Sequence, residues 1–108
     1  MKVKEIATKL GLEVISGSLE EEVSGIYVGD LLSNVMAQAK PGNIWITVHS
    51  HQNVVAVASL TEVAAVIVVE NFPIEPATVQ KAGEVEVTIL RTPMSAADLI
   101  RKLIALGV

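Results

Sequence analysis

The chain has 108 residues, the usual length of one domain, and 51% of them are hydrophobic although it holds only one Trp, one Tyr and one Phe. A net charge of −4 with scattered Lys and Arg disfavours nucleic-acid binding, because neutralising phosphates supplies most of that affinity. The absence of cysteine excludes disulfides, thiol nucleophiles and thiolate metal sites, and it fits a cytoplasmic protein. The longest apolar run, residues 63–69, is too short to span a membrane, and the opening segment lacks the apolar region of a signal peptide.

The first elements follow from apolar spacing. Residues 3–10 repeat apolar side chains at helical spacing, and Gly11 follows as a suitable C-cap. The segment LEVISG, 12–17, is typical of a short strand. After an acidic loop, VSGIYVGD, 23–30, is a second apolar run bounded by glycine. We therefore expect a helix and two strands in this region.

A helix is predicted next, in LLSNVMAQA at 31–39, with Asp30 as a possible N-cap. The Lys-Pro-Gly sequence at 40–42 ends it. One face of this helix is apolar, and we interpret it as core, with a partner surface as the alternative. The strand NIWITV follows at 43–48, since β-branched and aromatic residues favour a pleated, buried surface. Trp45 is expected in the core or at a subunit interface.

The segment NVVAVASLTEV, 53–63, fits a helix or a strand by pattern alone. We predict a helix with Asn53 as its N-cap. The continuous apolar run AAVIVV, 64–69, is typical of a strand that is covered on both faces.

The last third of the chain predicts two further helices around a strand. A loop and a helix occupy 71–84, with Pro76 in the first turn. The strand VEVTIL follows at 85–90. The final helix lies within 92–107, where the spacing of Ser95 and Asp98 is that of a capping box.

Short strands alternate with helices along most of the chain. This order predicts an α/β fold in one domain, 1–108: a three-layer sandwich with a mainly parallel sheet of about five short strands and helices on both faces. The high aliphatic content on a small chain also predicts that some apolar surface is buried against a second copy, as a homodimer.

The chain as a whole resembles a DRTGG domain, a family similar to the N-terminal domain of HPr kinase/phosphorylase. The resemblance is carried by VKEIATKLGLEVISG at the start, by VSGIYVGDLLSNVMAQAKPGNIWITVHSHQNVVAVASL and AAVIVVENFPIEPATVQKA, and by the closing VTILRTPMSAADLIRKLIALG. It implies an α/β module without kinase chemistry. Relatives occur between CBS modules of regulated pyrophosphatases and in phosphotransacetylases, where they look like spacers or dimerisation elements, and as small free-standing copies beside iron hydrogenase genes.

The chain departs from the family at the two places that give it its name. The family has an Asp-Arg pair and a Thr-Gly-Gly run at strand ends, whereas this chain has HSHQN at 49–53 and Val-Glu-Asn at 69–71. A phosphate cradle of glycine amides is therefore not expected at the second place.

Ligands of open α/β sheets bind at the carboxyl ends of the strands, so we expect any ligand-binding residues there. The alternative is that each of them caps a helix or solvates a turn. The candidate ligand-binding residues are Asp30, His49, Ser50, His51, Asn71, Arg91 and Thr92.

No catalytic or metal site is predicted. His49 and His51 are two possible ligands, but zinc needs at least three from the protein, and metalloprotease spacing is missing. Ser50 lacks the Gly-x-Ser-x-Gly setting of a nucleophile, and there is no phosphate-binding loop. We therefore expect no enzyme activity and no cofactor.

Two functions remain from the sequence. The first is a non-catalytic regulatory domain that self-associates and docks to an unidentified larger enzyme or sensor. The second is a domain that senses a nucleotide or another anion at the strand ends. Neither requires nucleic acid or a membrane.

Overall fold

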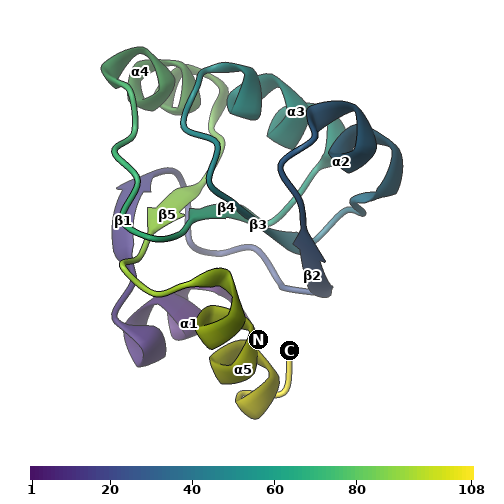
Figure 1. The fold of residues 1–108 in the computed structure, drawn as a ribbon, viewed down its shortest axis with the longest axis vertical. Coiled ribbons are helices and arrows are strands. Elements are labelled where there is room, and N and C mark those ends of the chain that lie inside the picture. The colour runs from purple at the N-terminus through teal and green to yellow at the C-terminus, as the bar shows by residue number, and fades with distance from the viewer.

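The strands and helices alternate along the chain, as the apolar pattern predicts (Figure 1). The computed structural model describes all residues, 1–108. In chain order the elements are α1 (Val3–Leu10), β1 (Glu13–Ser16), β2 (Gly25–Val28), α2 (Leu32–Gln38), β3 (Asn43–Thr47), α3 (Asn53–Thr61), β4 (Ala65–Val68), α4 (Pro76–Val85), β5 (Ile89–Arg91) and α5 (Ala96–Ala105).

The five strands form one sheet in the order β1-β5-β4-β3-β2. Strands β2 to β5 are parallel, and β1 pairs with β5 in the antiparallel direction. Each of β3, β4 and β5 lies beside the strand that precedes it in the chain, so the three crossovers all step in the same direction across the sheet. Right-handed crossovers in one direction place their helices on one face. Accordingly α2, α3 and α4 lie on one face and α1 and α5 on the other, which confirms the three-layer sandwich (Figure 1).

Two apolar cores fill the spaces between the layers, because successive strand residues point to opposite faces. In β3, Ile44 and Ile46 belong to the core beneath α1 and α5. Trp45 belongs to the core beneath α2, α3 and α4 and is fully buried. The two clusters hold 13 and 11 buried residues. Many of the aliphatic side chains are therefore buried inside the domain itself.

Several predicted helix ends are confirmed. Gly11 ends α1 in the left-handed conformation with φ 62°. Pro76 occupies the first turn of α4. The Ser95 side chain accepts a hydrogen bond from the Asp98 backbone N–H at 3.1 Å, so Ser95 is the N-cap of α5.

Two predicted caps are wrong. Asp30 does not cap α2; Leu31 is the N-cap, without a side-chain cap bond, because the Asp30 carboxylate bonds to β3 instead. The N-cap of α3 is Gln52, and Asn53 is already helical.

The predicted strand at 85–90 is also wrong at its start. Helix α4 continues through Val85 and ends at Glu86, whose φ is 60°, so the last strand is only Ile89–Arg91. A short apolar run does not distinguish the end of a helix from a strand, and Val85, which is 42% exposed, belongs to α4 and not to the buried sheet.

The apolar face predicted for α2 is only partly core. Val35 is fully buried, but Met36 is 48% and Leu31 69% exposed. None of the five helices has both the length and the apolar character needed to cross a bilayer.

Candidate functional site

The carboxyl ends of the parallel strands lie at one edge of the sheet. Asp30 follows β2, the 49–51 segment follows β3, Asn71 follows β4, and Arg91 and Thr92 close β5. The fold therefore places all seven candidate ligand-binding residues along this edge. Their hydrogen bonds within the domain determine which of them could still bind a ligand.

Asp30 ties the end of β2 to the end of β3. Its Oδ1 accepts a hydrogen bond from Thr47 Oγ1 at 2.7 Å and another from the Val48 backbone N–H at 3.0 Å. Thr47 is 2% exposed, so its hydroxyl needs this partner. His49 closes the cluster, since its Nε2–H donates to the Asp30 carbonyl oxygen and its backbone N–H donates to Thr47 Oγ1 at 3.1 Å.

Ser50 and His51 hold the start of α3. The Ser50 carbonyl oxygen accepts a hydrogen bond from Thr78 Oγ1 of α4 at 2.7 Å. The His51 Nδ1 accepts from the Asn53 backbone N–H at 3.1 Å. The imidazole therefore satisfies one of the donors that a helix N-terminus leaves free.

Arg91 is held between two side chains at the far end of the edge. Its Nε and Nη2 donate to Asn71 Oδ1 at 3.1 and 2.8 Å, and Nε lies 3.8 Å from Glu13 Oε1 on the antiparallel strand. Thr92 is 2% exposed, and its hydroxyl accepts from the Met94 backbone N–H at 3.2 Å. The contacts of Arg91 use two of the five N–H donors of its guanidinium group.

The turn after β4 has an unusual backbone. Glu70 and Asn71 both have φ 57°, and the Phe72 N–H bonds to the Val69 carbonyl oxygen at 3.3 Å. Glycine favours this conformation and glutamate disfavours it. The Glu70 N–H bonds to the Met94 carbonyl at 2.8 Å, which ties the turn to the segment after β5.

None of the seven residues lines a cavity. The reason is topological. A crevice forms at the carboxyl edge of an open sheet where the strand order reverses and neighbouring crossovers run to opposite faces. In this sheet β2 to β5 follow each other without reversal, and α2, α3 and α4 stay on one face.

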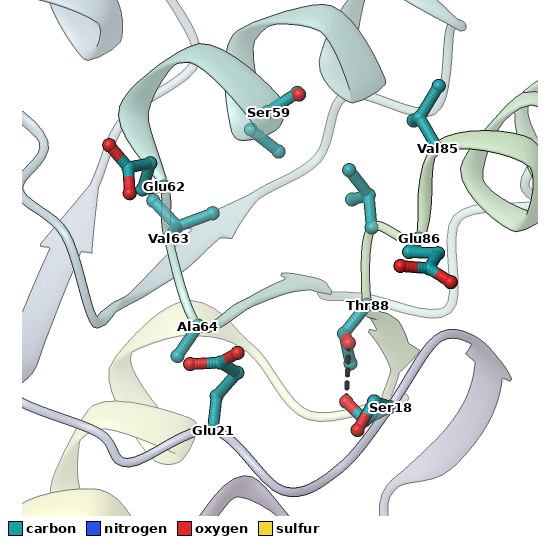
Figure 2. A pocket seen from close by; sticks show the side chains of 11 residues that line it. Ser18, Glu21, Ser59, Glu62, Val63, Ala64, Val85, Glu86 and Thr88 are labelled. Carbon is teal, nitrogen blue, oxygen red and sulfur yellow. Dashed lines mark hydrogen bonds between the residues drawn. The ribbon is translucent and has the colours of Figure 1, made fainter.

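A cavity of about 280 Å³ lies at the opposite edge, where the strands begin. Glu62 and Glu86 line it from the left-handed C-caps of α3 and α4, and Glu21 lines it from the loop before β2. Figure 2 shows these carboxylates around the opening, with Thr88 Oγ1 donating to the Ser18 carbonyl oxygen.

The lining of this cavity holds no Lys, Arg or His. Two helix C-termini add partial negative charge, so the cavity repels phosphates. The sequence prediction missed it because it considered only the carboxyl edge. The signal was present in the sequence as a glutamate just after each of two helices, at Glu62 and Glu86.

Metal-binding geometry is missing from the whole structure. No group of three or more His, Cys, Asp or Glu side chains is arranged to hold a metal ion. His49 and His51 point to separate partners, the Asp30 carbonyl and the Asn53 N–H.

Comparison with known proteins identifies the family. The DRTGG domain family model matches residues 5–106. The chain belongs to the DRTGG domain family. After β4, Glu70 and Asn71 have a backbone conformation that suits glycine.

A solved structure shares the fold of this DRTGG domain. It contains the CBS and DRTGG domains of the regulatory region of Clostridium perfringens pyrophosphatase in complex with an activator, diadenosine tetraphosphate. The TM-score is 0.74 at 16% sequence identity, over 92% of this chain and 44% of that chain. The chain thus spans less than half the length of that neighbour. No curated protein matches the chain.

Proposed function

We propose that this DRTGG domain is a non-catalytic, cytoplasmic regulatory domain that self-associates and docks to a larger enzyme or sensor, in the regulation of a hydrogenase or of phosphotransfer. One observation carries the proposal: the polar residues at the carboxyl edge already have hydrogen-bond partners within the domain. Asp30, Arg91 and His51 each have structural partners there.

Membership of the DRTGG family supports the regulatory part of the proposal. The relative in the pyrophosphatase is part of a regulatory region and is joined to CBS domains in one chain. A domain that lacks reacting groups acts on a neighbour by binding it or by bringing two copies together.

The experiment measures the molar mass of the purified domain by gel filtration with light scattering. We expect a mass of twice the 11.4 kDa chain at micromolar concentration. A monomer throughout the concentration range would contradict self-association.

The second candidate is a sensor of a nucleotide or another anion at the carboxyl edge. One observation favours it: the pyrophosphatase neighbour is complexed with diadenosine tetraphosphate. In this chain the candidate residues are Asp30, His49, Ser50, His51, Asn71, Arg91 and Thr92. Arg91 is the only permanent cation among them, and its Nη1 donors are not used in the bond to Asn71.

A thermal-shift experiment with diadenosine tetraphosphate, adenosine monophosphate and divalent metals tests the second candidate. A ligand at about 100 times its Kd adds about 2.7 kcal/mol of stability, which raises the Tm by roughly 10 °C in a domain of this size. A shift that Arg91→Ala abolishes would support the sensor. No shift with any compound would favour the regulatory domain without a ligand.

A further inference from the structure

A second hollow lies between α3 and α4, which are neighbours on the same face of the sheet (Figure 1). We call it the α3–α4 groove. Its volume is about 360 Å³. Small-molecule sites span about 300–1,000 Å³ and are lined by apolar side chains with a few polar groups. The α3–α4 groove has room for a small molecule, and its lining decides which kind.

One half of the α3–α4 groove is apolar. Leu60 of α3 and Val85 of α4 line it, and they are 70% and 42% exposed. Ala56 lies one turn before Leu60, on the same side of α3, and the buried Val55 lines the groove as well. An apolar group that enters here is removed from water together with the side chains it covers, so this half favours an apolar ligand.

The other half of the groove carries polar groups and one positive charge. Gln52 and Asn53 lie at the N-terminal end of α3, and both are exposed. Lys81 of α4 lies near them, since Gln52 and Lys81 line both this groove and the smaller hollow beside it. Lys81 is the only charged residue in the lining of the groove.

The ammonium group of Lys81 is only weakly engaged within the domain. Its Nζ lies 3.9 Å from Glu84 Oε2, which is beyond hydrogen-bond distance, and both side chains are more than half exposed. Glu84 lines the smaller hollow and not the α3–α4 groove. Exposed ion pairs of this kind are weak, so an anion in the groove can compete for the ammonium group.

The two helices are tied together at the polar end of the groove. Thr78 of α4 is 1% exposed, and its Oγ1 donates to the Ser50 carbonyl oxygen, just before α3, at 2.7 Å. This bond fixes the spacing of the helices before a ligand arrives. A preformed site binds more tightly because less order has to be imposed on binding.

The acidic cavity at the amino edge sets the orientation of a charged ligand. Ser59 and Val85 line both that cavity and the α3–α4 groove, so the apolar half of the groove adjoins Glu62 and Glu86. An anionic group at that end would face like charges, whereas at the other end it meets Lys81.

We propose that the α3–α4 groove binds a small amphipathic anion, a molecule with an apolar body and one carboxylate, sulfonate or phosphate group. The ammonium group of Lys81 binds the anionic group, and the side-chain amides of Gln52 and Asn53 are further donors. The apolar body lies between Leu60 and Val85. This site is distinct from the carboxyl edge and is independent of the self-association and of the anion sensor proposed above.

The test uses anilinonaphthalene sulfonate, a fluorescent probe with an apolar body and one sulfonate. The wild-type domain is titrated with the probe, which is then displaced by octanoate, octanol or octylammonium. These three competitors share one apolar chain and differ in the charge of the head. We expect saturable binding of the probe, and displacement by octanoate at concentrations at least about tenfold lower than by octanol or octylammonium.

Substitutions on the two helices assign the parts of the site. Lys81→Gln is expected to weaken octanoate about tenfold and to leave octanol unchanged, whereas Leu60→Ser weakens both. Glu84→Gln removes the competing carboxylate and is expected to strengthen octanoate. The matched control is Lys102→Gln on α5, an exposed lysine on the opposite layer, which leaves all affinities unchanged. All four positions are exposed, and circular dichroism and thermal unfolding check that each variant keeps the fold.

Three results would overturn this site. The first is a wild-type domain that shows no saturable binding of the probe. The second is octanol that displaces the probe as well as octanoate does, or binding that neither Lys81→Gln nor Leu60→Ser changes. The third is octanoate binding that Arg91→Ala weakens while Lys81→Gln does not, which would place the anion at the carboxyl edge and support the sensor proposed above.

Discussion

Replacement of Asp30 by alanine tests whether this residue serves the fold or a ligand. The substitution removes one acceptor of two hydrogen bonds, from Thr47 Oγ1 at 2.7 Å and from the Val48 N–H at 3.0 Å. Hydrogen bonds to a charged group contribute about 1.5–3 kcal/mol each, and the exposure of Asp30 favours the low end. We expect Asp30→Ala to lower the free energy of unfolding by about 3 kcal/mol.

The assay is equilibrium unfolding in urea, followed by the fluorescence of Trp45, whose Nε1–H donates to the neighbouring Gly29 carbonyl at 2.9 Å. A loss of about 3 kcal/mol corresponds to a Tm lower by roughly 10 °C or more for a domain of this size. Asp30→Asn retains an acceptor oxygen and is expected to recover at least half of the loss. The control is Asp98→Ala, where an exposed pair with Arg101 is lost, at a cost below about 1 kcal/mol.

A double-mutant cycle with Thr47→Val identifies the partner. Because Asp30 and Thr47 form one bond, the double variant is expected to lose less stability than the two single variants added together, by about 1 kcal/mol or more. The structural role would be refuted by an Asp30→Ala variant as stable as the wild type, or by strict additivity with Thr47→Val.

Three further substitutions test local features. Glu70→Gly relieves a left-handed residue and is expected to raise the free energy of unfolding by about 1 kcal/mol, whereas Glu70→Ala, which keeps the Cβ, leaves it nearly unchanged; equal stabilities would contradict this account. His51→Ala removes the acceptor of the Asn53 N–H and is expected to cost about 0.5–1 kcal/mol in thermal unfolding, while His51→Asn restores a capping oxygen. The hydrogen bond between Lys2 and Glu20 lowers the pKa of Glu20 and raises the pKa of Lys2. The contribution of Glu20 to the free energy of unfolding is therefore present above its unfolded pKa, and it is lost as the pH falls through its folded pKa. The contribution of Lys2 is present below its unfolded pKa, and it is lost as the pH rises through its folded pKa. Glu20→Gln should remove this pH dependence at low ionic strength, and a persistent dependence, or one that resists high salt, would argue against it.

Much of the fold was predictable because local patterns report local environments. The run at 64–69 lacks polar residues, and β4 is buried on both faces. The spacing in 3–10 predicted α1 and its end at Gly11. The predictions were wrong where one sequence pattern fits two structures. Val85 was predicted in a strand but belongs to α4. Asp30 was predicted to cap α2, but its carboxylate bonds to Thr47 of β3.

The candidate site was predictable only as a location. The rule that strand ends gather at one edge placed Asn71 and Arg91 together, and they are bonded at 2.8 Å. The rule did not predict that these residues would be engaged with each other, nor that the edge would lack a cavity. Those outcomes depend on distances between elements that no local pattern encodes.

The sequence by itself determined the α/β class, the order of the elements and the apolar nature of both layers, because each depends on residues a few positions apart. Only the tertiary structure decided the role of Asp30, whose partner Thr47 lies 17 positions away, and the position of the cavity among Glu21, Glu62 and Glu86. The physical reason is the direction of the crossovers. They step across the sheet without reversal, which leaves the carboxyl edge without a crevice and gathers α2, α3 and α4 on one face of the sheet.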